Sequence, residues 1–309
     1  MNAASRVEPG AAPGRVLVTG LTGFTGRYVA ETLVQRGFEV YGTVAGRDST
    51  AAHGAREYVA DLLDPVALRQ VIEEVRPNHV LHLAAIAFVA HGDVDAIYRT
   101  NVIGTRNLLQ AIVAAGSSDI RSVLLASSAN VYGNALVHPI DEGVSPAPAN
   151  DYAVSKLAME YMAALWRDQL PITIVRPFNY TGVGQSLQFL LPKIVNAYRE
   201  RAAELELGNI EVERDFSDVR DVADAYARLL DAPAGHVVNV CSGTTCSLSE
   251  ILLMAQEITG HEPTVRTNPA FVRANEVRRL QGSNGRLHSL IGAWHTRPIR
   301  ETLEWMLTA

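Results

Sequence analysis

The segment VLVTGLTGFTG, residues 16–26, limits the possible folds more than any other stretch of the chain. An apolar run typical of a buried strand leads to glycines at positions 20, 23 and 26, and a helical pattern begins at the last glycine. Because glycine has no Cβ, the backbone N–H groups of such a turn can approach a neighbouring group closely. The spacing predicts a turn built around a bound ligand, and a tight turn without a ligand is the alternative.

Short apolar runs alternate with longer helical patterns through the following residues. Asp64 and Pro65 suit the start of a helix, and Gly37 suits the end of the one before it. This alternation indicates an α/β fold, a doubly wound parallel Rossmann sheet with helices on both faces. The predicted strands are residues 15–19, 38–44, 79–84, 122–127 and 172–177, and the predicted helices are about residues 26–36, 65–76, 93–115 and 152–166.

The rhythm of strands and helices breaks after Pro177. A helical pattern at residues 214–230 and an apolar run at residues 236–243 could rejoin the sheet. The expected domains are a dinucleotide-binding Rossmann domain at 15–177, rejoined by about 215–241, a smaller discontinuous C-terminal substrate lobe at 178–214 and 242–309, and a loose tail at 1–14.

Composition and charge exclude several classes of protein. The formal net charge of -6 leaves no large basic face for nucleic acid or an anionic membrane. Cys241 and Cys246 are too few for a disulfide framework and lack the spacing of a zinc site, so we expect buried thiols and no metal. The longest apolar run, residues 80–90, is about half of what a membrane span requires, and no export signal precedes it. We therefore expect a cytoplasmic protein.

Two further motifs carry polar groups that suit proton transfer. DYAVSK places Tyr152 and Lys156 four residues apart, on one face of the predicted helix. A phenol donates poorly near neutral pH unless a cation stabilises its phenolate, and Lys156 is placed to be that cation. LLASSANVYG ends a strand with Ser127 and Ser128, where hydroxyl groups of a doubly wound sheet face the ligand crevice.

From Arg15 to about Met306 the chain resembles the extended short-chain dehydrogenase/reductase family of nucleotide-sugar enzymes. The resemblance implies that Ser128 hydrogen-bonds a sugar carbonyl and that Tyr152 donates the proton. Lys156 would lower the pKa of Tyr152 and hold the nicotinamide ribose. The motifs that carry the resemblance are the glycine loop, ADL (60–62), HLAA (82–85), TNVIGTRNLL (100–109), SSANVYG (127–133), YAVSK (152–156), RPFNYTG (176–182) and RDFSDVRD (214–221).

The same resemblance implies bound NADP(H) or NAD(H). Asp61 and Leu62 would flank the adenine, and Asn101 would support the active-site network. Ala84 and Ala85 would line the pyrophosphate side. Asn101 and these two alanines could instead only pack in the core. No acid occupies residues 42–45 and Arg47 is within reach, so NADPH should be accepted, unless Asp48 folds back and favours NAD. The residues expected to contact the cofactor are Gly20, Gly23, Phe24, Thr25, Gly26, Arg47, Asp61, Leu62, Leu83, Ala84, Ala85, Asn101, Tyr152 and Lys156.

Residues 176–195, 207–222 and 240–243 are similar to the branch of that family that contains GDP-mannose 4,6-dehydratase and GDP-4-keto-6-deoxy-mannose reductase. This similarity implies a GDP-sugar substrate, whose phosphates suit arginine guanidinium groups. For Arg214, a surface ion pair with Asp215 or Asp218 is the alternative. The residues expected to contact the substrate are Asn179, Lys193, Asn209, Arg214, Arg273 and Glu276.

The residue at position 130, here Asn130, distinguishes the reactions that members of this branch catalyse. Dehydratases carry a Glu here, and an amide is no base near neutral pH. Epimerising reductases carry a Cys at this place and a His where this chain has residues 183–185. We therefore expect simple reduction by NAD(P)H at C4 of GDP-4-keto-6-deoxy-D-mannose, giving GDP-D-rhamnose or its C4 epimer.

Three other functions stay open. A 4-epimerase of the UDP-glucose type uses the same Ser, Tyr and Lys, and a 4,6-dehydratase is less favoured. A non-catalytic dinucleotide sensor would not need Ser128, Tyr152 and Lys156. The resemblance also implies a homodimer, joined through the helices of residues 101–115 and 152–166.

Overall fold

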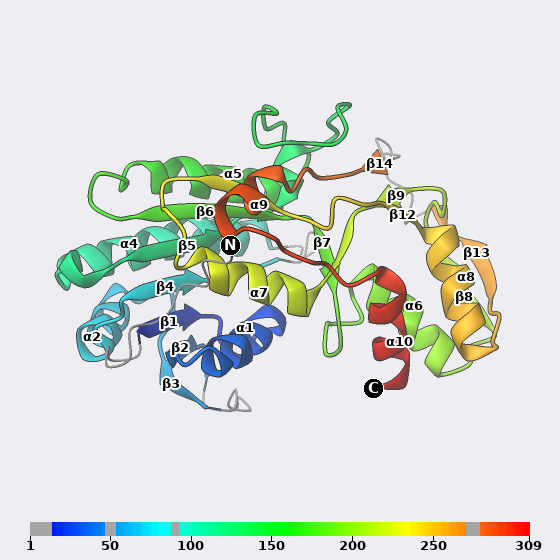
Figure 1. Cartoon of the computed structure of the whole chain (residues 1–309), viewed down its shortest axis with the longest axis horizontal. Helices are drawn as coiled ribbons and strands as arrows, with labels where there is room; N and C mark the ends of the chain where they lie inside the picture. The colour runs from blue at the N-terminus through cyan, green and yellow to red at the C-terminus, as the bar shows by residue number, and fades with distance from the viewer. Residues whose placement is uncertain (1–13, 47–53, 88–92, 270–278) are drawn as a thin grey trace.

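The computed structural model describes residues 14–46, 54–87, 93–269 and 279–309. Its centre is a seven-stranded parallel sheet with the order β11-β6-β5-β4-β1-β2-β3 (Figure 1), so the predicted fold class is confirmed. The strand order reverses between β1 and β4, and in such sheets ligands bind beyond the carboxyl ends of the strands at this point. The strands are β1 (Arg15–Thr19), β2 (Glu39–Val44), β3 (Ala55–Val59), β4 (His79–His82), β5 (Ser122–Ala126), β6 (Ile172–Pro177) and β11 (Val237–Val240).

Helices cover both faces of the sheet, and β1 shows why its sequence is a continuous apolar run. Val16 and Val18 face one core and Leu17 faces the other, so all three side chains are fully buried. Helices α1 (Phe24–Gln35), α7 (Val219–Leu229) and α9 (Gly285–Ile291) cover the first face, where α1 and α7 lie side by side (Figure 1). Helices α2 (Pro65–Val75), α4 (Thr105–Ala114) and α5 (Asp151–Ala164) cover the second.

The predicted helix boundaries at Gly37 and Asp64 are confirmed. Gly37 follows α1 with φ +85°, a conformation that favours glycine. Asp64 caps α2, because its side chain accepts hydrogen bonds from the backbone N–H groups of Val66 and Ala67, both at 3.0 Å.

Two elements differ from the prediction. The single helix predicted for residues 93–115 is divided into α3 (Val94–Tyr98), the π-helical segment η1 (Arg99–Gly104) and α4, with the short 3₁₀ turn η2 (Ser117–Asp119) beyond. Strand β3 was not predicted, because polar residues such as Arg56 and Glu57 interrupt its apolar pattern at the edge of the sheet.

A second core lies beyond the sheet, at the right of Figure 1. Helices α6 (Leu190–Arg199), α8 (Leu248–Thr259) and α10 (Ile299–Thr308) pack around it, and β11 returns to the main sheet between the segments that form this lobe. The exact domain boundaries stay a prediction. The remaining strands pair as β7 (Asn179–Thr181) with β10 (Phe216–Asp218), β8 (Glu204–Leu207) with β13 (Thr264–Thr267), and β9 (Glu213–Arg214) with both β12 (Cys246–Ser247) and β14 (Arg279–Leu280).

Side chains of α10 attach this lobe to α7. The Thr302 hydroxyl donates to the Asp218 carboxylate at 2.8 Å, and the Arg220 guanidinium lies 3.8 Å from the ring centroid of Trp305. Both cysteines are buried free thiols, as predicted. Within the described ranges, no helix has the length and apolar character needed to cross a membrane.

Candidate active site

The three predicted catalytic side chains meet where helix α5 packs against the end of strand β5. The Lys156 ammonium donates to the backbone carbonyl of Ala126, the last residue of β5, at 2.8 Å. Tyr152 forms a side-chain hydrogen bond with Ser128. Asn150 caps α5 by accepting from the N–H of Ala153 at 2.9 Å, which places Tyr152 in the first turn of the helix. All three predicted catalytic residues are buried.

Burial dominates the pKa values of this site. It raises the pKa of the Tyr152 phenol well above its ordinary value, and the hydrogen bond to Ser128 only partly opposes it. Burial is the largest influence on the phenol, and the lowering of its pKa by Lys156 stays a prediction. Burial also lowers the pKa of Lys156 to about 8, while the Glu160 carboxylate raises it. Near neutral pH the site therefore holds a protonated phenol beside an ammonium group.

Ser128 is held by Asn130. Ser128 is the N-cap of the 3₁₀ helix η3 (Ala129–Tyr132), and its hydroxyl oxygen accepts from the backbone N–H of Asn130 at 3.2 Å. The side-chain amide of Asn130 also donates to this oxygen, at 3.1 Å. Sequence reasoning treated Asn130 only as a missing base, and the structure gives it a supporting contact. Ser127 departs from the prediction, because its hydroxyl donates to the buried Glu160 rather than facing the crevice.

The glycine loop packs closely against the chain's own backbone. Gly20 has φ +73°, and a Cβ on it would lie 2.9 Å from the backbone N of Ala84. A Cβ on Gly26 would collide with the carbonyl oxygens of Gly20 and Leu21. No side chain caps the N-terminus of α1 at Gly23, so the helix offers its first backbone N–H groups to an anion. This cradle fits a dinucleotide pyrophosphate.

The aromatic side chains near the loop connect it to β7. The Phe24 and Tyr180 rings stack with centroids 6.1 Å apart, and the Thr25 and Tyr180 hydroxyls are 2.8 Å apart. Tyr226 on α7 lies nearby, since Tyr180 and Tyr152 both raise its pKa in addition to burial. The buried Tyr226 hydroxyl has no hydrogen-bond partner among the described residues, which fits a site that receives a polar group.

Asn101 connects the catalytic helix to the loop after β4. Its side chain accepts from the backbone N–H of Ile86 at 2.9 Å and donates to the carbonyl of the same residue at 3.1 Å. It also donates to the Ser155 hydroxyl at 3.0 Å, and Ser155 donates to the carbonyl of Tyr152 at 2.7 Å. Asn101 lies in the π-helical segment η1, a kind of irregularity often found at functional sites.

A second polar chain, which sequence reasoning missed, continues from η1 to β1. The Thr105 hydroxyl donates to the carbonyl of Asn101 at 2.8 Å and lies 2.8 Å from His82 Nε2. His82 Nδ1 lies 2.6 Å from the Thr19 hydroxyl, which accepts from the N–H of Ala84 at 3.2 Å. Burial lowers the pKa of His82 to about 3, so the imidazole is neutral and connects the two hydroxyl groups.

The other predicted cofactor residues that the structure describes lie after β3 and β4. Asp61 is exposed, and its carboxylate accepts from the N–H of Leu63 at 2.9 Å. Leu62 is buried against Gly104, and a Cβ added to Gly104 would lie 2.8 Å from the Cβ of Leu62. Leu83, Ala84 and Ala85 follow β4 and are half-buried. Arg47 lies outside the described residues, as does Asp48, so the structure does not test the argument on NADPH preference.

The predicted substrate residues are spread over the second lobe. The Asn179 amide donates to the carbonyl of Asp215 at 3.4 Å, and Asn209 accepts from the N–H of Glu211 at 3.0 Å. The Lys193 ammonium, on α6, donates to the carbonyl of Glu206 at 2.8 Å. These contacts do not bring Lys193 to Tyr152. Arg273 and Glu276 lie outside the described residues.

The carboxylates suggested as partners of Arg214 have other partners. Asp215 accepts from the Ser242 hydroxyl at 2.6 Å, and Asp218 forms an ion pair with Arg220 at 2.6 Å. Arg214 itself donates to the carbonyl of Glu213 at 2.9 Å. Its role toward a substrate stays a prediction.

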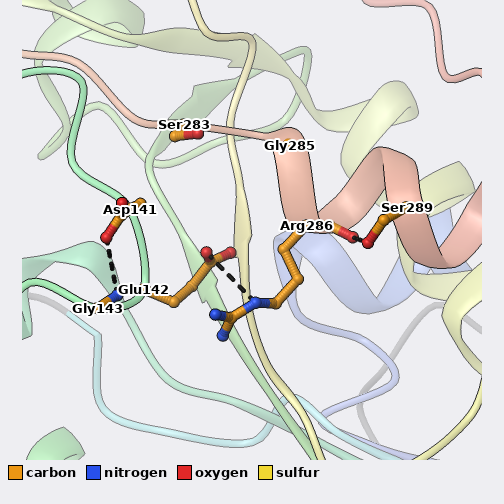
Figure 2. Close-up of a pocket in the computed structure, with 7 residues that line it drawn as sticks. All are labelled: Asp141, Glu142, Gly143, Ser283, Gly285, Arg286 and Ser289. Carbon is orange, nitrogen blue, oxygen red and sulfur yellow. Dashed lines mark hydrogen bonds and ion pairs between the residues drawn. The ribbon is translucent and has the colours of Figure 1, made fainter.

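A cavity of about 450 Å³ lies apart from the predicted site residues (Figure 2). Its buried carboxylate, Glu142, faces Arg286 at 3.6 Å and accepts from the backbone N–H of Asn239 at 2.7 Å. Glu142 is thus paired with Arg286 and with the backbone of Asn239, so this cavity gives no separate indication of a ligand. Its lining residues are Asp141, Glu142, Gly143, Ser283, Gly285, Arg286 and Ser289.

Sequence comparisons agree with the class of enzyme that this sheet, glycine cradle and Ser-Tyr-Lys arrangement define, the extended short-chain dehydrogenases/reductases. Residues 17–306 match the family described as GDP-mannose 4,6 dehydratase, and the chain belongs to this family. It is 36% identical to GDP-6-deoxy-D-mannose reductase of Pseudomonas aeruginosa, covering 95% of this chain and 96% of the relative. It is 34% identical to GDP-6-deoxy-D-talose 4-dehydrogenase of Aggregatibacter actinomycetemcomitans, covering 94% and 96%.

Solved structures of similar proteins have the same fold. A provisionally assigned epimerase from Burkholderia cenocepacia J2315 has a TM-score of 0.91 and 50% identity, over 96% of this chain and 98% of that one. RMD from Pseudomonas aeruginosa, solved in complex with NADPH, has a TM-score of 0.82 and 34% identity, over 97% and 98%. Other structures of this fold hold NAD.

Gly26→Ala tests the glycine cradle. The added methyl group meets two backbone carbonyls, so we expect NADPH affinity to fall by at least about tenfold, the equivalent of roughly 1.4 kcal/mol. Isothermal titration calorimetry measures it. Gly285→Ala is the matched control, because its Cβ would only reach ordinary contact distance, 3.7 Å from the Ser283 hydroxyl. Unchanged affinity in Gly26→Ala contradicts the assignment of this loop.

Proposed function

We propose that the protein binds NADP(H) or NAD(H) and reduces the C4 carbonyl of GDP-4-keto-6-deoxy-D-mannose to give GDP-D-rhamnose or its C4 epimer. The observation that carries the proposal is the convergence of Ser128, Tyr152 and Lys156, with Asn130 in the place of a dehydratase base. The fit of the glycine cradle and the cofactors held by related structures support the same cofactor here.

The chain's own residues then act in the following way. Bound NAD(P)H supplies the hydride. Two donors from Asn130 occupy the lone pairs of the Ser128 hydroxyl, so its one proton, which points to Tyr152 before the substrate binds, turns to the C4 carbonyl oxygen. Tyr152 gives its phenolic proton to the same oxygen as it becomes an alkoxide, and the phenolate is later reprotonated from solvent. The nearby Lys156 ammonium stabilises the transient negative charge.

Burial keeps Tyr152 protonated, which is the form that a reductase needs, while donation of this proton requires a cation such as Lys156 to stabilise the phenolate. A reductase needs a protonated donor at the start of each turnover, and burial keeps the phenol protonated through the neutral range. Oxidation of an alcohol needs the phenolate, which the same burial disfavours. We therefore expect reduction to be the faster direction near neutral pH.

The site offers no base for the carbons beside the ketone in the two places where family members carry one. The Asn130 amide is engaged with Ser128. In the turn after β7, the Gln185 amide accepts from the Thr181 hydroxyl at 2.8 Å and donates to the carbonyl of Tyr180 at 3.2 Å. Neither amide can remove a proton near neutral pH, so we expect reduction without epimerisation at C3 or C5.

The face of hydride attack at C4 stays open. Two relatives at 34–36% identity carry the names of 6-deoxy-talose and 6-deoxy-mannose enzymes, and these sugars are C4 epimers of one another. The names support C4 as the reacting carbon.

Reaction in D2O tests the proposed function. Purified protein, GDP-4-keto-6-deoxy-D-mannose and NADPH should consume the cofactor in a one-to-one ratio with product, followed by absorbance. The product should carry no deuterium at C3 or C5, as determined by NMR, because the amides of Asn130 and Gln185 cannot act as bases. Deuterium there would instead identify an epimerising reductase. Interconversion of a UDP-hexose without added cofactor would move the function to a 4-epimerase.

Tyr152→Phe is the control for this reaction. Removal of the proton donor should lower the rate by at least the ~10²-fold typical of general acid catalysis, with NADPH affinity nearly unchanged. Turnover near that of the unmodified protein would remove Tyr152 from the mechanism.

We further propose a homodimer formed through residues 101–115, which include most of η1 and all of α4, and residues 152–166, which include most of α5 and the two residues after it. Apolar side chains are exposed on these elements, including Ile103 at 47%, Tyr161 at 66% and Leu165 at 79%. Light scattering at micromolar concentration should give the mass of a dimer, and Tyr161→Glu with Leu165→Glu should give a monomer. Leu253→Glu, on the exposed face of α8, is the matched control and should remain a dimer. A monomeric unmodified protein contradicts this interface.

A further inference from the structure

A third residue continues the catalytic face of α5. Glu160 lies one turn beyond Lys156, as Lys156 lies one turn beyond Tyr152. Its carboxylate accepts from the Ser127 hydroxyl at 2.5 Å, so it binds the residue directly before Ser128. Residues 152, 156 and 160 of the helix thus bind residues 128, 126 and 127 at the end of β5.

Arg176 of β6 completes this arrangement. Its guanidinium donates to both carboxylate oxygens of Glu160, at 2.9 and 2.6 Å. It also lies over the ring of Tyr132, 4.8 Å from the centroid. Ser127, Glu160 and Arg176 are exposed by 3%, 6% and 5%, so the pair is removed from water. A buried ion pair is a poor source of stability compared with apolar packing, which suggests a role in the adjacent site.

The charges around Lys156 come from several elements. His82 of β4 is neutral, and Tyr152 is protonated near neutral pH. Arg176 stays charged because its hydrogen bonds to Glu160 outweigh its burial. Burial lowers the pKa of Lys156, and among the titratable groups around it only Glu160 raises that pKa. The carboxylate is therefore the one group among these that supports the charge of Lys156.

We propose that Glu160 is a positioning residue for the reduction, which clamps α5 to the end of β5 through Ser127 and balances the charge of Lys156. The inference rests on the proposed function for its catalytic meaning. Glu160 touches neither substrate nor cofactor in this account, and it acts through Lys156 and the strand end that carries Ser128.

The chain permits a direct test, because Lys156 and Lys193 are its two lysines. Protein labelled with ¹³C at lysine Cε gives one signal for each, and Lys193→Arg assigns them. The Lys156 signal is followed against pH without cofactor or substrate. In Glu160→Gln the amide keeps the shape and can still accept from Ser127, but the negative charge is lost. We expect the midpoint of Lys156 to fall by roughly one pH unit, since an opposite charge has been removed.

Two further variants complete the test. Glu160→Gln leaves Arg176 buried without a counter-charge and could unfold the protein, so Glu160→Gln with Arg176→Gln removes both charges and should show a smaller fall in the same direction, because the nearer charge, Glu160, has the larger effect on Lys156. Asp221→Asn is the control, because it removes another buried carboxylate, which pairs with the more exposed Arg297. Its Lys156 midpoint should equal that of the unmodified protein.

The pH profile of the rate provides the second readout. The ammonium is lost as pH rises through the pKa of Lys156, so a lower pKa moves the alkaline fall in kcat to lower pH. KM for the sugar should change little at pH values where Lys156 is still charged. A shifted titration supports the coupling even if no reduction is observed, in which case only the proposed function fails. An unchanged Lys156 midpoint in the double variant overturns the inference.

Discussion

The packing of one face of α5 against the last residues of β5 is the constraint on which the site depends. Residues four apart on a helix share a face, so Tyr152 and Lys156 reach the strand end together. A small rotation or shift of α5 would break both contacts at once. A hydrogen bond from Asn101 to Ser155 also connects α5 to the irregular segment η1.

Burial of this contact explains its chemistry as well as its geometry. A phenol removed from water keeps its proton, which suits donation to a developing alkoxide, while a buried ammonium tends to lose its charge. Burial therefore suffices to keep Tyr152 protonated, whereas Lys156, one helical turn further on, needs a nearby negative charge to stay protonated. A carboxylate on the next turn, neutralised on its far side by Arg176, supplies the charge that the ammonium requires.

The sequence predicts the parts of this site that depend on local geometry. The glycine loop follows from the need for a bare backbone, and the pairing of Tyr152 with Lys156 follows from helical period. It does not predict the Glu160–Arg176 pair, because these residues belong to different elements and meet only when α5 packs on β6. The direction of the Ser127 side chain and the large effect of burial on the pKa of Tyr152 are likewise tertiary effects. The edge strand β3 was missed because its sequence, AREYV, places polar residues on both faces of the strand.

The central claim is that the site delivers a hydride to C4 of a keto-sugar while Tyr152 delivers the proton. Transfer of deuterium from NADPH labelled at C4 of the nicotinamide, each stereoisomer in turn, tests it most directly. The account predicts that one of the two labelled cofactors places deuterium at C4 of the GDP-6-deoxy-sugar, and that the other leaves the product unlabelled. Deuterium at another carbon, or in neither product, would contradict it.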